Sequence, residues 1–205
     1  MDLSAAAAFW VLSLLFVLAP GADWAFAISA GLHGRVIGPA VGGLLAGHLT
    51  HTLLVAVGVG ALVARAPEVL TALTVAGAAY LVWFGVGTLT RAAAPRADDA
   101  AVARSPGQWA ARGWGISGLN PKVLLLLVAL LPQFTDPGGG WPLPVQIALL
   151  GLAHTVSCAV VYTSVALTAR HVLRARPTAA LVVSRMSGVV MIGLGAVLGV
   201  EQLLR

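Results

Sequence analysis

Three histidines stand out in an otherwise apolar sequence because each can carry a proton. His48 and His51 are three residues apart, so on a helix they share one face. His154 has a similar setting, since Leu-Leu-Ala-Gly-His-Leu-Thr-His-Thr (44–52) is matched by Leu-Leu-Gly-Leu-Ala-His-Thr (149–155). Histidine titrates near neutrality, which favours proton coupling. A metal site is the weaker interpretation because no carboxylate or cysteine cluster accompanies these residues, and we predict none.

A carboxylate, Asp23, follows a sequence that should break a helix, Pro20-Gly21-Ala22. Proline removes a backbone donor and clashes with the preceding turn. A break at membrane depth is tolerated only where protein or a wet cavity satisfies the freed backbone groups. Asp23 is therefore predicted to bind a substrate ammonium or a proton. The alternative is that Asp23 caps a helix or lies at the membrane interface.

A matching break is expected at Asn120-Pro121, directly before Lys122. The lysine precedes the run Val-Leu-Leu-Leu-Leu-Val, so it either snorkels to an interface along its aliphatic stem or faces the interior of a helix bundle. In the interior it needs an anion, either Asp23 or a substrate carboxylate. Lys122 and Asp23 would then flank one central site, and we include Asn120 among its substrate-binding or coupling residues.

The composition indicates that lipid surrounds these groups. Of the 205 residues, 59% are hydrophobic and 9% charged, whereas soluble proteins carry charge on about a quarter of their residues. Six stretches approach the roughly 20 apolar residues that a membrane helix needs. They cover, approximately, residues 5–30, 38–63, 69–89, 113–134, 144–168 and 181–204. Because these runs are continuously apolar, they predict an all-α membrane protein rather than a barrel.

The chain is expected to form one membrane domain, residues 1–205, built from two inverted repeats. Repeat 1 covers about 5–90, a flexible linker about 91–112, and repeat 2 about 113–205. Pro20 and Pro121 are 101 residues apart, and His51 and His154 are 103 apart, so the halves are in similar register. Each half has three segments, so the second must be inverted in the membrane.

Close helix packing is expected at pairs of glycines four residues apart. The pairs are Gly38/Gly42, Gly43/Gly47 and Gly195/Gly199. Two further histidines, His33 and His171, are expected in loops. The single cysteine, Cys158, excludes an internal disulfide and is expected to be a small packing residue.

The distribution of Lys and Arg predicts an orientation. Nine of them fall in loops one, three and five, and two fall on the opposite side. These three loops are therefore expected in the cytoplasm and both termini outside, if all six segments span. The N-terminus lacks the basic flank of a secretory signal, so the first segment is expected to be retained. The formal charge of +5 is explained by this orientation, and no nucleic-acid partner is predicted.

An ordered set of motifs adds a resemblance. The motifs are Pro20-Gly21-Ala22-Asp23, Ala76-Gly77-Ala78-Ala79-Tyr80-Leu81, Asn120-Pro121-Lys122, Leu131-Pro132-Gln133-Phe134 and Ser187-Gly188. Together they resemble the LysE/RhtB family of amino-acid exporters over essentially the whole chain. The resemblance implies about six membrane segments and export of lysine, arginine, homoserine, threonine, leucine or related molecules, driven by the ion gradient. Two departures are Ala22 in place of a second proline, and His48 where members often carry an acid.

The sequence and the resemblance together predict a secondary transporter in a bacterial-type cytoplasmic (inner) membrane. It would export amino acids or closely related metabolites by proton-coupled alternating access, without a cofactor. The expected partners are a small-molecule substrate and the lipid bilayer, with a homo-oligomer left open. The main alternative is an exporter of metal cations or another small solute on the same fold. No nucleophile paired with a base is evident, so we do not expect an enzyme. A passive structural subunit has little reason to bury Asp23 and Lys122.

Overall fold

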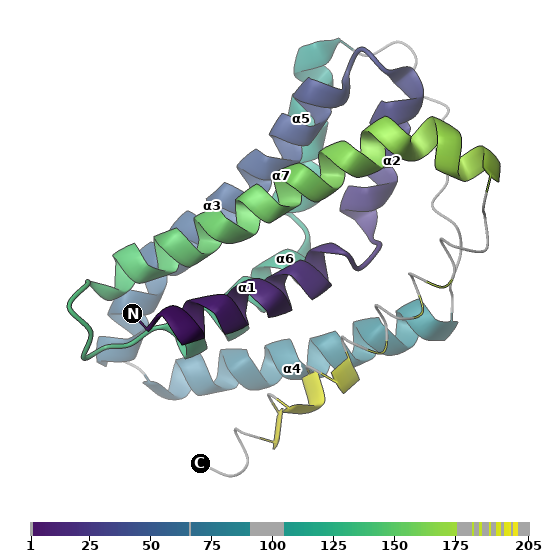
Figure 1. Ribbon diagram of the computed structural model, residues 1–205. Helices are drawn as coiled ribbons and strands as arrows, with labels where there is room; N and C mark the ends of the chain where they lie inside the picture. Colours follow the sequence, from purple (N-terminus) through teal and green to yellow (C-terminus); the bar gives the residue numbers. More distant parts are fainter. Residues whose placement is uncertain are drawn as a thin grey trace.

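The computed structural model describes residues 2–65, 67–90 and 105–175, together with isolated positions between 182 and 200. In these residues every element is helical, as the apolar runs predicted (Figure 1). The elements are α1 (Leu3–Val17), α2 (Ala22–His33), α3 (Ile37–Arg65), α4 (Pro67–Thr90), α5 (Pro106–Gly118), α6 (Pro121–Leu130), the 3₁₀ helix η2 (Leu131–Phe134) and α7 (Leu143–Ala175).

Two helices of the described residues are long and apolar enough to cross a membrane. They are the parts Ile37–Gly58 of α3 and Leu143–Ala169 of α7. The pair α1 and α2 would form a third span, bent by 61° at its break. By length and apolar composition, the described residues thus contain two or three membrane crossings. The six crossings expected from the sequence stay a prediction. The last predicted stretch, 181–204, lies mostly outside the described residues.

The first break separates α1 from α2 around Pro20. Helix α1 ends at Val17, and the extended backbone of Gly21 precedes α2. Proline cannot donate a backbone hydrogen bond, so the ladder of α1 cannot continue through it. The indole Nε1–H of Trp24 donates to the carbonyl of Val17 at 2.8 Å and so satisfies an acceptor at the end of α1. The Trp24 side chain of α2 therefore stabilises the bend between the two helices.

The second break lies between α5 and α6, at Leu119 and Asn120. Pro121 is the first residue of α6, where its missing N–H costs nothing. The carbonyl of Asn120 accepts from the N–H groups of Val123 and Leu124, which starts the new helix. The expected interruption at Asn120-Pro121 thus coincides with a helix boundary.

Helix α5 begins earlier than the sequence pattern predicted. The linker was expected to continue to Arg112, but α5 starts at Pro106, and residues 91–104 lie outside the described residues. The cause is a capping box in which the Ser105 hydroxyl accepts from the Gln108 N–H and the Gln108 side chain accepts from the Ser105 N–H. The helix is amphipathic and short of large apolar residues, so hydrophobicity alone did not identify it.

Glycines allow α3 and α5 to lie in direct backbone contact. A Cβ on Gly43 would lie 2.1 Å from the Ala110 carbonyl oxygen, and one on Gly47 would lie 2.6 Å from the Gly118 nitrogen. In the other two predicted pairs, Gly38/Gly42 and Gly195/Gly199, only Gly195 lies close to another helix. Gly195 approaches Ala78 of α4, with a Cβ-to-oxygen distance of 2.6 Å.

The remaining glycines of these pairs face open space. A Cβ on Gly38, Gly42 or Gly199 would have no described atom within 4 Å. For Gly42 the reason is helical geometry, because Gly42 and Gly43 differ by about 100° around the α3 axis and only one of them can face α5. Close packing was thus predicted wrongly for these three glycines among the described residues.

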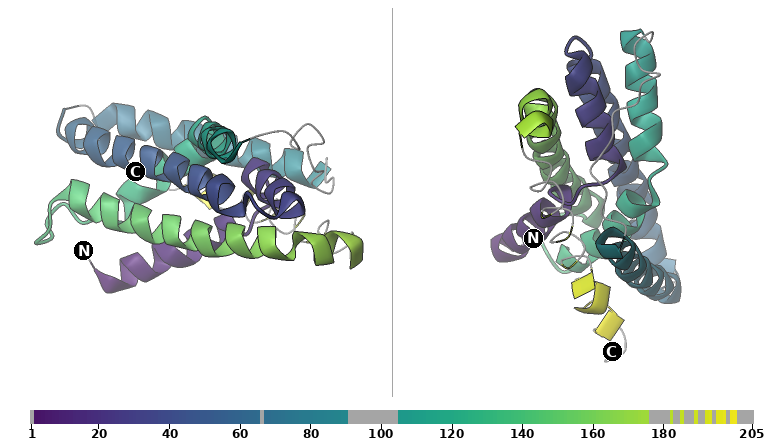
Figure 2. Two further views of the ribbon diagram at one scale, coloured as in Figure 1. Left: turned by 90° about the horizontal axis from the view of Figure 1, so that it is seen from above. Right: turned by 90° about the vertical axis from the view of Figure 1, so that its right-hand side faces the viewer.

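Helix α3 makes contact with α2, α4, α5, α6 and α7. Helix α5 runs beside α3, while α7 packs against both α3 and α2, and α4 packs against α6 (Figure 2). Helix α1 lies against α7. The halves of the broken pair α1 and α2 therefore both reach α7, and this places the first break next to the middle of the two longest helices. His33 and His171, expected in loops, lie instead near the C-terminal ends of α2 and α7.

Candidate functional site

Six buried side chains from four helices meet next to the first break. We call them the histidine cluster: Ser13 of α1, Asp23 of α2, His48 of α3, and His154, Cys158 and Tyr162 of α7. His154 and Cys158 have no exposed surface, and His48 is 1% and Asp23 5% exposed. The three residues of α7 are spaced by four, so they share one face of that helix.

A continuous path of hydrogen bonds runs through the cluster. The Ser13 Oγ lies 2.7 Å from Nδ1 of His154, whose Nε2 lies 3.2 Å from Nδ1 of His48. The other ring nitrogen of His48, Nε2, lies 3.4 Å from Oδ2 of Asp23. The Tyr162 hydroxyl donates to the same carboxylate oxygen at 3.0 Å. The path thus joins four helices and ends on the one carboxylate of the cluster.

One arrangement of protons satisfies this path with both histidines neutral and Asp23 ionised. An ionised carboxylate only accepts, so His48 must donate from Nε2 and accept at Nδ1. His154 must then donate from Nε2 and accept at Nδ1, and the donor to it is the Ser13 hydroxyl. All donors therefore point from Ser13 toward Asp23, as in a proton relay.

The position of Asp23 lowers the cost of its burial. An isolated carboxylate in an apolar interior is very costly unless hydrogen bonds or opposite charge stabilise it. Asp23 lies in the first turn of α2, where the helix dipole favours a negative charge. Tyr162 and His48 add two donors to one of its oxygens. Because the first break starts α2 at this point, the dipole of α2 helps to stabilise the buried carboxylate of Asp23.

The second break approaches the same helix, one turn away. The Nε2 atom of His51 lies 3.2 Å from the carbonyl oxygen of Ser117, in the last turn of α5. His48 and His51 are three residues apart on α3, so His48 meets Asp23 beyond one break and His51 meets Ser117 just before the other. The two breaks therefore flank neighbouring turns of α3.

Several buried polar side-chain atoms have no hydrogen-bond partner among the described residues. They are the Nδ1 atom of His51 and the hydroxyls of Ser29, Thr52 and Ser117. An unsatisfied buried polar atom costs about 1–3 kcal/mol, so such atoms are rarely left without a ligand or water. His51 and Ser117 lie together between the breaks. These atoms are candidates to bind a small polar molecule.

The structure brings together three of the six predicted site residues, Asp23, His48 and His154. His51 lies one turn from them and contacts α5 instead. Asn120 lies in the second break, directly before α6, and Lys122 lies in the first turn of α6, but the side chains of Pro121 and Lys122 lie outside what the structure describes. Whether Lys122 meets Asp23 remains a prediction.

Sequence reasoning missed Ser13 and Tyr162 and assigned Cys158 to packing. The spacing of His154, Cys158 and Tyr162 was the available signal, because three polar or reactive groups four residues apart on an apolar helix share one stripe. Ser13 carried no comparable signal. It became part of the cluster only because α1 packs across α7 at His154.

Comparison with known proteins gives this site a family context. Residues 14–202 match the family model described as LysE type translocator. An uncharacterized membrane protein of Vibrio cholerae is 33% identical over 97% of this chain and 98% of its own length. No solved structure matches the chain.

Two relatives have named functions. A homoserine/homoserine lactone efflux protein of Salmonella typhimurium is 33% identical over 80% of each chain. A cysteine/O-acetylserine efflux protein of Salmonella choleraesuis is 31% identical over 69% of this chain and 73% of its own. The family predicted from the ordered set of motifs along the chain is thereby confirmed, and the chain belongs to the LysE family of membrane translocators.

Proposed function

We propose that this translocator exports amino acids or closely related metabolites across the bacterial cytoplasmic membrane. The observation that carries the proposal is the buried carboxylate of Asp23, which lies directly beyond a broken helix and bonds to His48 and Tyr162. An acidic group in the membrane interior is costly, and its usual use is to bind a cation or a proton. The efflux activities for which the two relatives from Salmonella are named agree with an exporter.

The substrate is proposed to bind between the two breaks. Its ammonium group would meet Asp23 and backbone carbonyls of the first break, and its carboxylate would meet Lys122 and the N-terminus of α6. The support is that both breaks approach neighbouring turns of α3, through His48 and His51. Asn120, His51 and the hydroxyl of Ser117 would contribute polar contacts. The substrate is thus recognised at both of its charged ends.

Proton coupling is proposed to use the path from Ser13 to Asp23. A proton that arrives at Nδ1 of His154 would release the Nε2 proton of that ring to His48, and His48 would pass its Nε2 proton to Asp23. Both histidines would change tautomer, and Asp23 would become neutral. Neutral Asp23 binds an ammonium group less strongly, so proton uptake and substrate release would be linked.

Alternating access is proposed to follow from two inverted repeats of three segments. In this interpretation the broken pairs α1/α2 and α5/α6 are the first segments of the two halves, and α3 and α7 are the second segments. The support is that both first segments are interrupted and that His51 and His154 occupy similar positions on α3 and α7. Rocking of the halves would open the site first to the cytoplasm and then to the outside.

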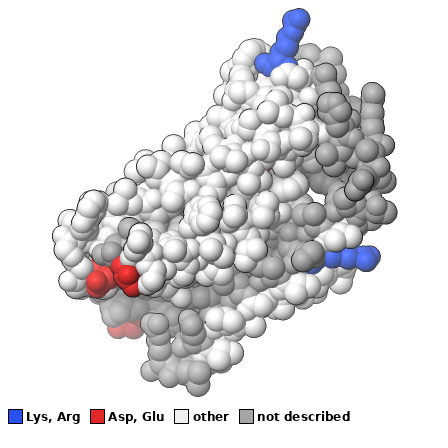
Figure 3. Space-filling model, in the orientation of Figure 1, with Lys and Arg blue, Asp and Glu red and all other residues white. Residues whose placement is uncertain are grey.

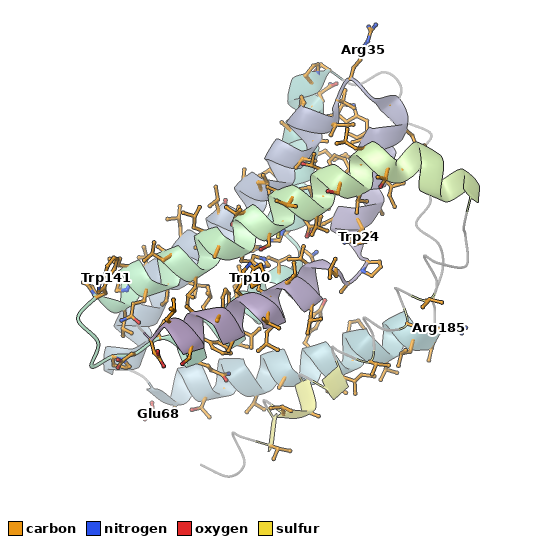
Figure 4. All side chains as sticks on the ribbon, in the orientation of Figure 1. Trp10, Trp24, Arg35, Glu68, Trp141 and Arg185 are labelled. Atoms are coloured by element: carbon orange, nitrogen blue, oxygen red, sulfur yellow. The ribbon has the colours of Figure 1, made fainter. Side chains whose placement is uncertain are left out.

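The proposed orientation places loops one, three and five in the cytoplasm. Figure 3 shows the visible basic side chains at the upper and right-hand ends of the molecule and the acidic ones at the lower left. In Figure 4 these ends are identified by Arg35 and Arg185 on one side and by Glu68 and Trp141 on the other. Basic residues concentrate on the cytoplasmic side of membrane proteins. The Arg35 end would therefore face the cytoplasm.

A flux assay in inverted membrane vesicles tests this proposal. Vesicles with the wild-type protein should show proton-dependent uptake of an amino acid, and Asp23→Asn and Lys122→Ala should abolish it. The matched control is His33→Asn, because His33 lies on α2 outside the histidine cluster. If both the Asp23→Asn and the Lys122→Ala variants keep the uptake of the wild type, the proposed substrate site is wrong.

Export of metal cations on the same fold is the alternative function, with the histidines as cargo ligands. Growth of an expressing strain on toxic amino acids, dipeptides and metal salts separates the two. Protection against an amino acid or its analogue supports the proposal, whereas protection against metal salts alone supports the alternative.

A further inference from the structure

We propose that His48, His154 and Cys158 supply the three protein ligands of a binding site for a zinc-type transition-metal ion in the core of the protein. The proposal goes beyond amino-acid export and does not depend on it. It concerns an ion that binds within the bundle and makes no claim about cargo. Its basis is that one nitrogen of each histidine and the cysteine sulfur all lie within 4.8 Å of one another.

The spacing of the ligand atoms fits tetrahedral zinc. Zinc–nitrogen bonds of about 2.0–2.1 Å and zinc–sulfur bonds of about 2.3 Å at tetrahedral angles place two nitrogens about 3.3 Å apart and a nitrogen and a sulfur about 3.6 Å apart. The Nε2 atom of His154 lies 3.2 Å from Nδ1 of His48 and 3.6 Å from Sγ of Cys158. These two distances suit one shared ion, while the third pair, a ring nitrogen of His48 and Sγ of Cys158, lies within 4.8 Å and would close around the ion.

The nitrogens that face away from this point are already bonded, as metal-binding histidines require. Nε2 of His48 lies 3.4 Å from the Asp23 carboxylate, and Nδ1 of His154 lies 2.7 Å from the Ser13 hydroxyl. Such outer partners fix the ring orientation and raise the basicity of the ligating nitrogen. The cluster thus has both the ligands and the supporting groups of a metal site.

The two helices that carry the ligands are held at close range. His154 and Cys158 are one turn apart on α7, and His48 lies on the facing part of α3. Near this crossing, a Cβ on Gly151 would lie 2.2 Å from Cγ2 of Thr52, so the helices are in direct contact. The ligands therefore need little rearrangement to bind an ion.

The ligand type selects the ion. Two imidazoles and a thiolate favour zinc and similar transition-metal ions, whereas magnesium and calcium require several oxygen ligands. Charge agrees with a divalent ion, because a dication, the Cys158 thiolate and the Asp23 carboxylate sum to zero. Binding would release one proton, that of the thiol. The His154 proton would move to Nδ1 and donate to Ser13, and His48 would keep its proton on Nε2 toward Asp23.

Three protein ligands leave a fourth position for water or another small ligand, as in zinc sites that exchange their ligands. The alternative assigns Cys158 to packing and the histidines to hydrogen bonding alone. This alternative predicts that the thiol of Cys158 does not increase the affinity of the protein for a metal ion. The chain has a single cysteine, so any thiolate–metal signal must come from Cys158.

The experiment is a titration of the purified full chain in detergent with Co²⁺, a spectroscopic substitute for Zn²⁺. The expected result is saturation at one ion per chain with a thiolate-to-cobalt charge-transfer band, which Zn²⁺ displaces. Cys158→Ser should lose the band and bind Zn²⁺ more weakly by at least about tenfold, the lower limit for loss of even an outer-shell partner. His33→Asn should match the wild type, since that residue lies outside the cluster.

A second measurement needs no variant in the cluster. Zn²⁺ should raise the melting temperature of the wild-type protein in detergent, and EDTA should reverse the shift, because an ion that binds only the folded state stabilises it. Absence of both the charge-transfer band and the temperature shift in folded wild-type protein would overturn the proposal. Equal Zn²⁺ affinity of folded Cys158→Ser and wild type would overturn it as well. Neither readout involves transport, so failure here is independent of failure as an exporter.

Discussion

Nε2 of His154 lies 3.2 Å from Nδ1 of His48, although the two residues are 106 positions apart in the chain. The contact joins α7 to α3, the two longest apolar helices of the described residues. It also joins the two halves of the chain that are proposed to be inverted repeats. Proton relay and metal binding would use the same pair of nitrogens. The protein therefore cannot pass protons along this path while a metal ion is bound.

Ser13→Ala should destabilise the protein by about 1–3 kcal/mol, because it leaves a buried ring nitrogen of His154 without its donor at 2.7 Å. The measurement is thermal or denaturant unfolding in detergent. Ser164→Ala is the matched control, since this exposed hydroxyl donates to the Val160 carbonyl within α7. Its effect should stay within about 0.5 kcal/mol. Equal stability of both variants would argue against an ordered path at Ser13.

Tyr162→Phe should reduce proton-dependent uptake in inverted vesicles while the protein remains folded. The substitution keeps the buried ring but removes the hydroxyl that donates to Asp23 Oδ2 at 3.0 Å. Loss of this donor removes one hydrogen bond that stabilises the ionised carboxylate at the end of the proposed path. The chain has one other tyrosine, Tyr80 on α4, and Tyr80→Phe is the control. Similar uptake in the two variants would remove Tyr162 from the coupling path.

Gly43→Ala should lower stability by about 1–3 kcal/mol, the usual cost of overpacking. The new Cβ would lie 2.1 Å from the Ala110 carbonyl oxygen, a backbone atom that cannot move without shifting α5. Gly42→Ala adds the same atom on a face of α3 with nothing described within 4 Å. It should be neutral or slightly stabilising because alanine favours helix. The melting temperatures of the two variants in detergent provide the test, and a reversed order would contradict the α3–α5 contact.

Cysteine labelling should reveal the proposed orientation. Arg35→Cys is expected to react with a membrane-impermeant thiol reagent only from the cytoplasmic side, and Trp141→Cys only from the outside, since these exposed residues lie at opposite ends (Figure 4). The wild type is the control, because its sole cysteine is fully buried. Labelling of Trp141→Cys from the cytoplasm would reverse the orientation.

If both proposals hold, Zn²⁺ should inhibit uptake in inverted vesicles by occupying the nitrogens through which the proton passes. The quantity to compare is the ratio of flux with and without Zn²⁺ in each protein. That ratio should fall for the wild type and for His33→Asn, and stay near one for Cys158→Ser. Inhibition that persists unchanged in Cys158→Ser would assign the effect of Zn²⁺ to another site.

The sequence by itself determined that lipid surrounds the chain, that its segments are helical, and to which family it belongs. Continuous apolar runs leave the backbone no partner except itself, so Ile37–Gly58 and Leu143–Ala169 had to be helices. Pro20 and Pro121 indicated the places where helices end, because a missing N–H is a local property of one residue. Asp23 and His48 were recognisable because charge and titratable groups are costly in lipid.

Only the tertiary structure decided which of these groups meet. Asp23 and His154 both contact His48 because α2 and α7 pack against α3, and the glycines at close helix contacts look the same in sequence as those that face open space. Ser13 carried no signal of its own and joined the cluster only because α1 packs against α7, whereas Cys158 was marked only by its spacing of four residues from His154. Side-chain chemistry is local and readable from the residue, but the contact between distant segments is set by packing.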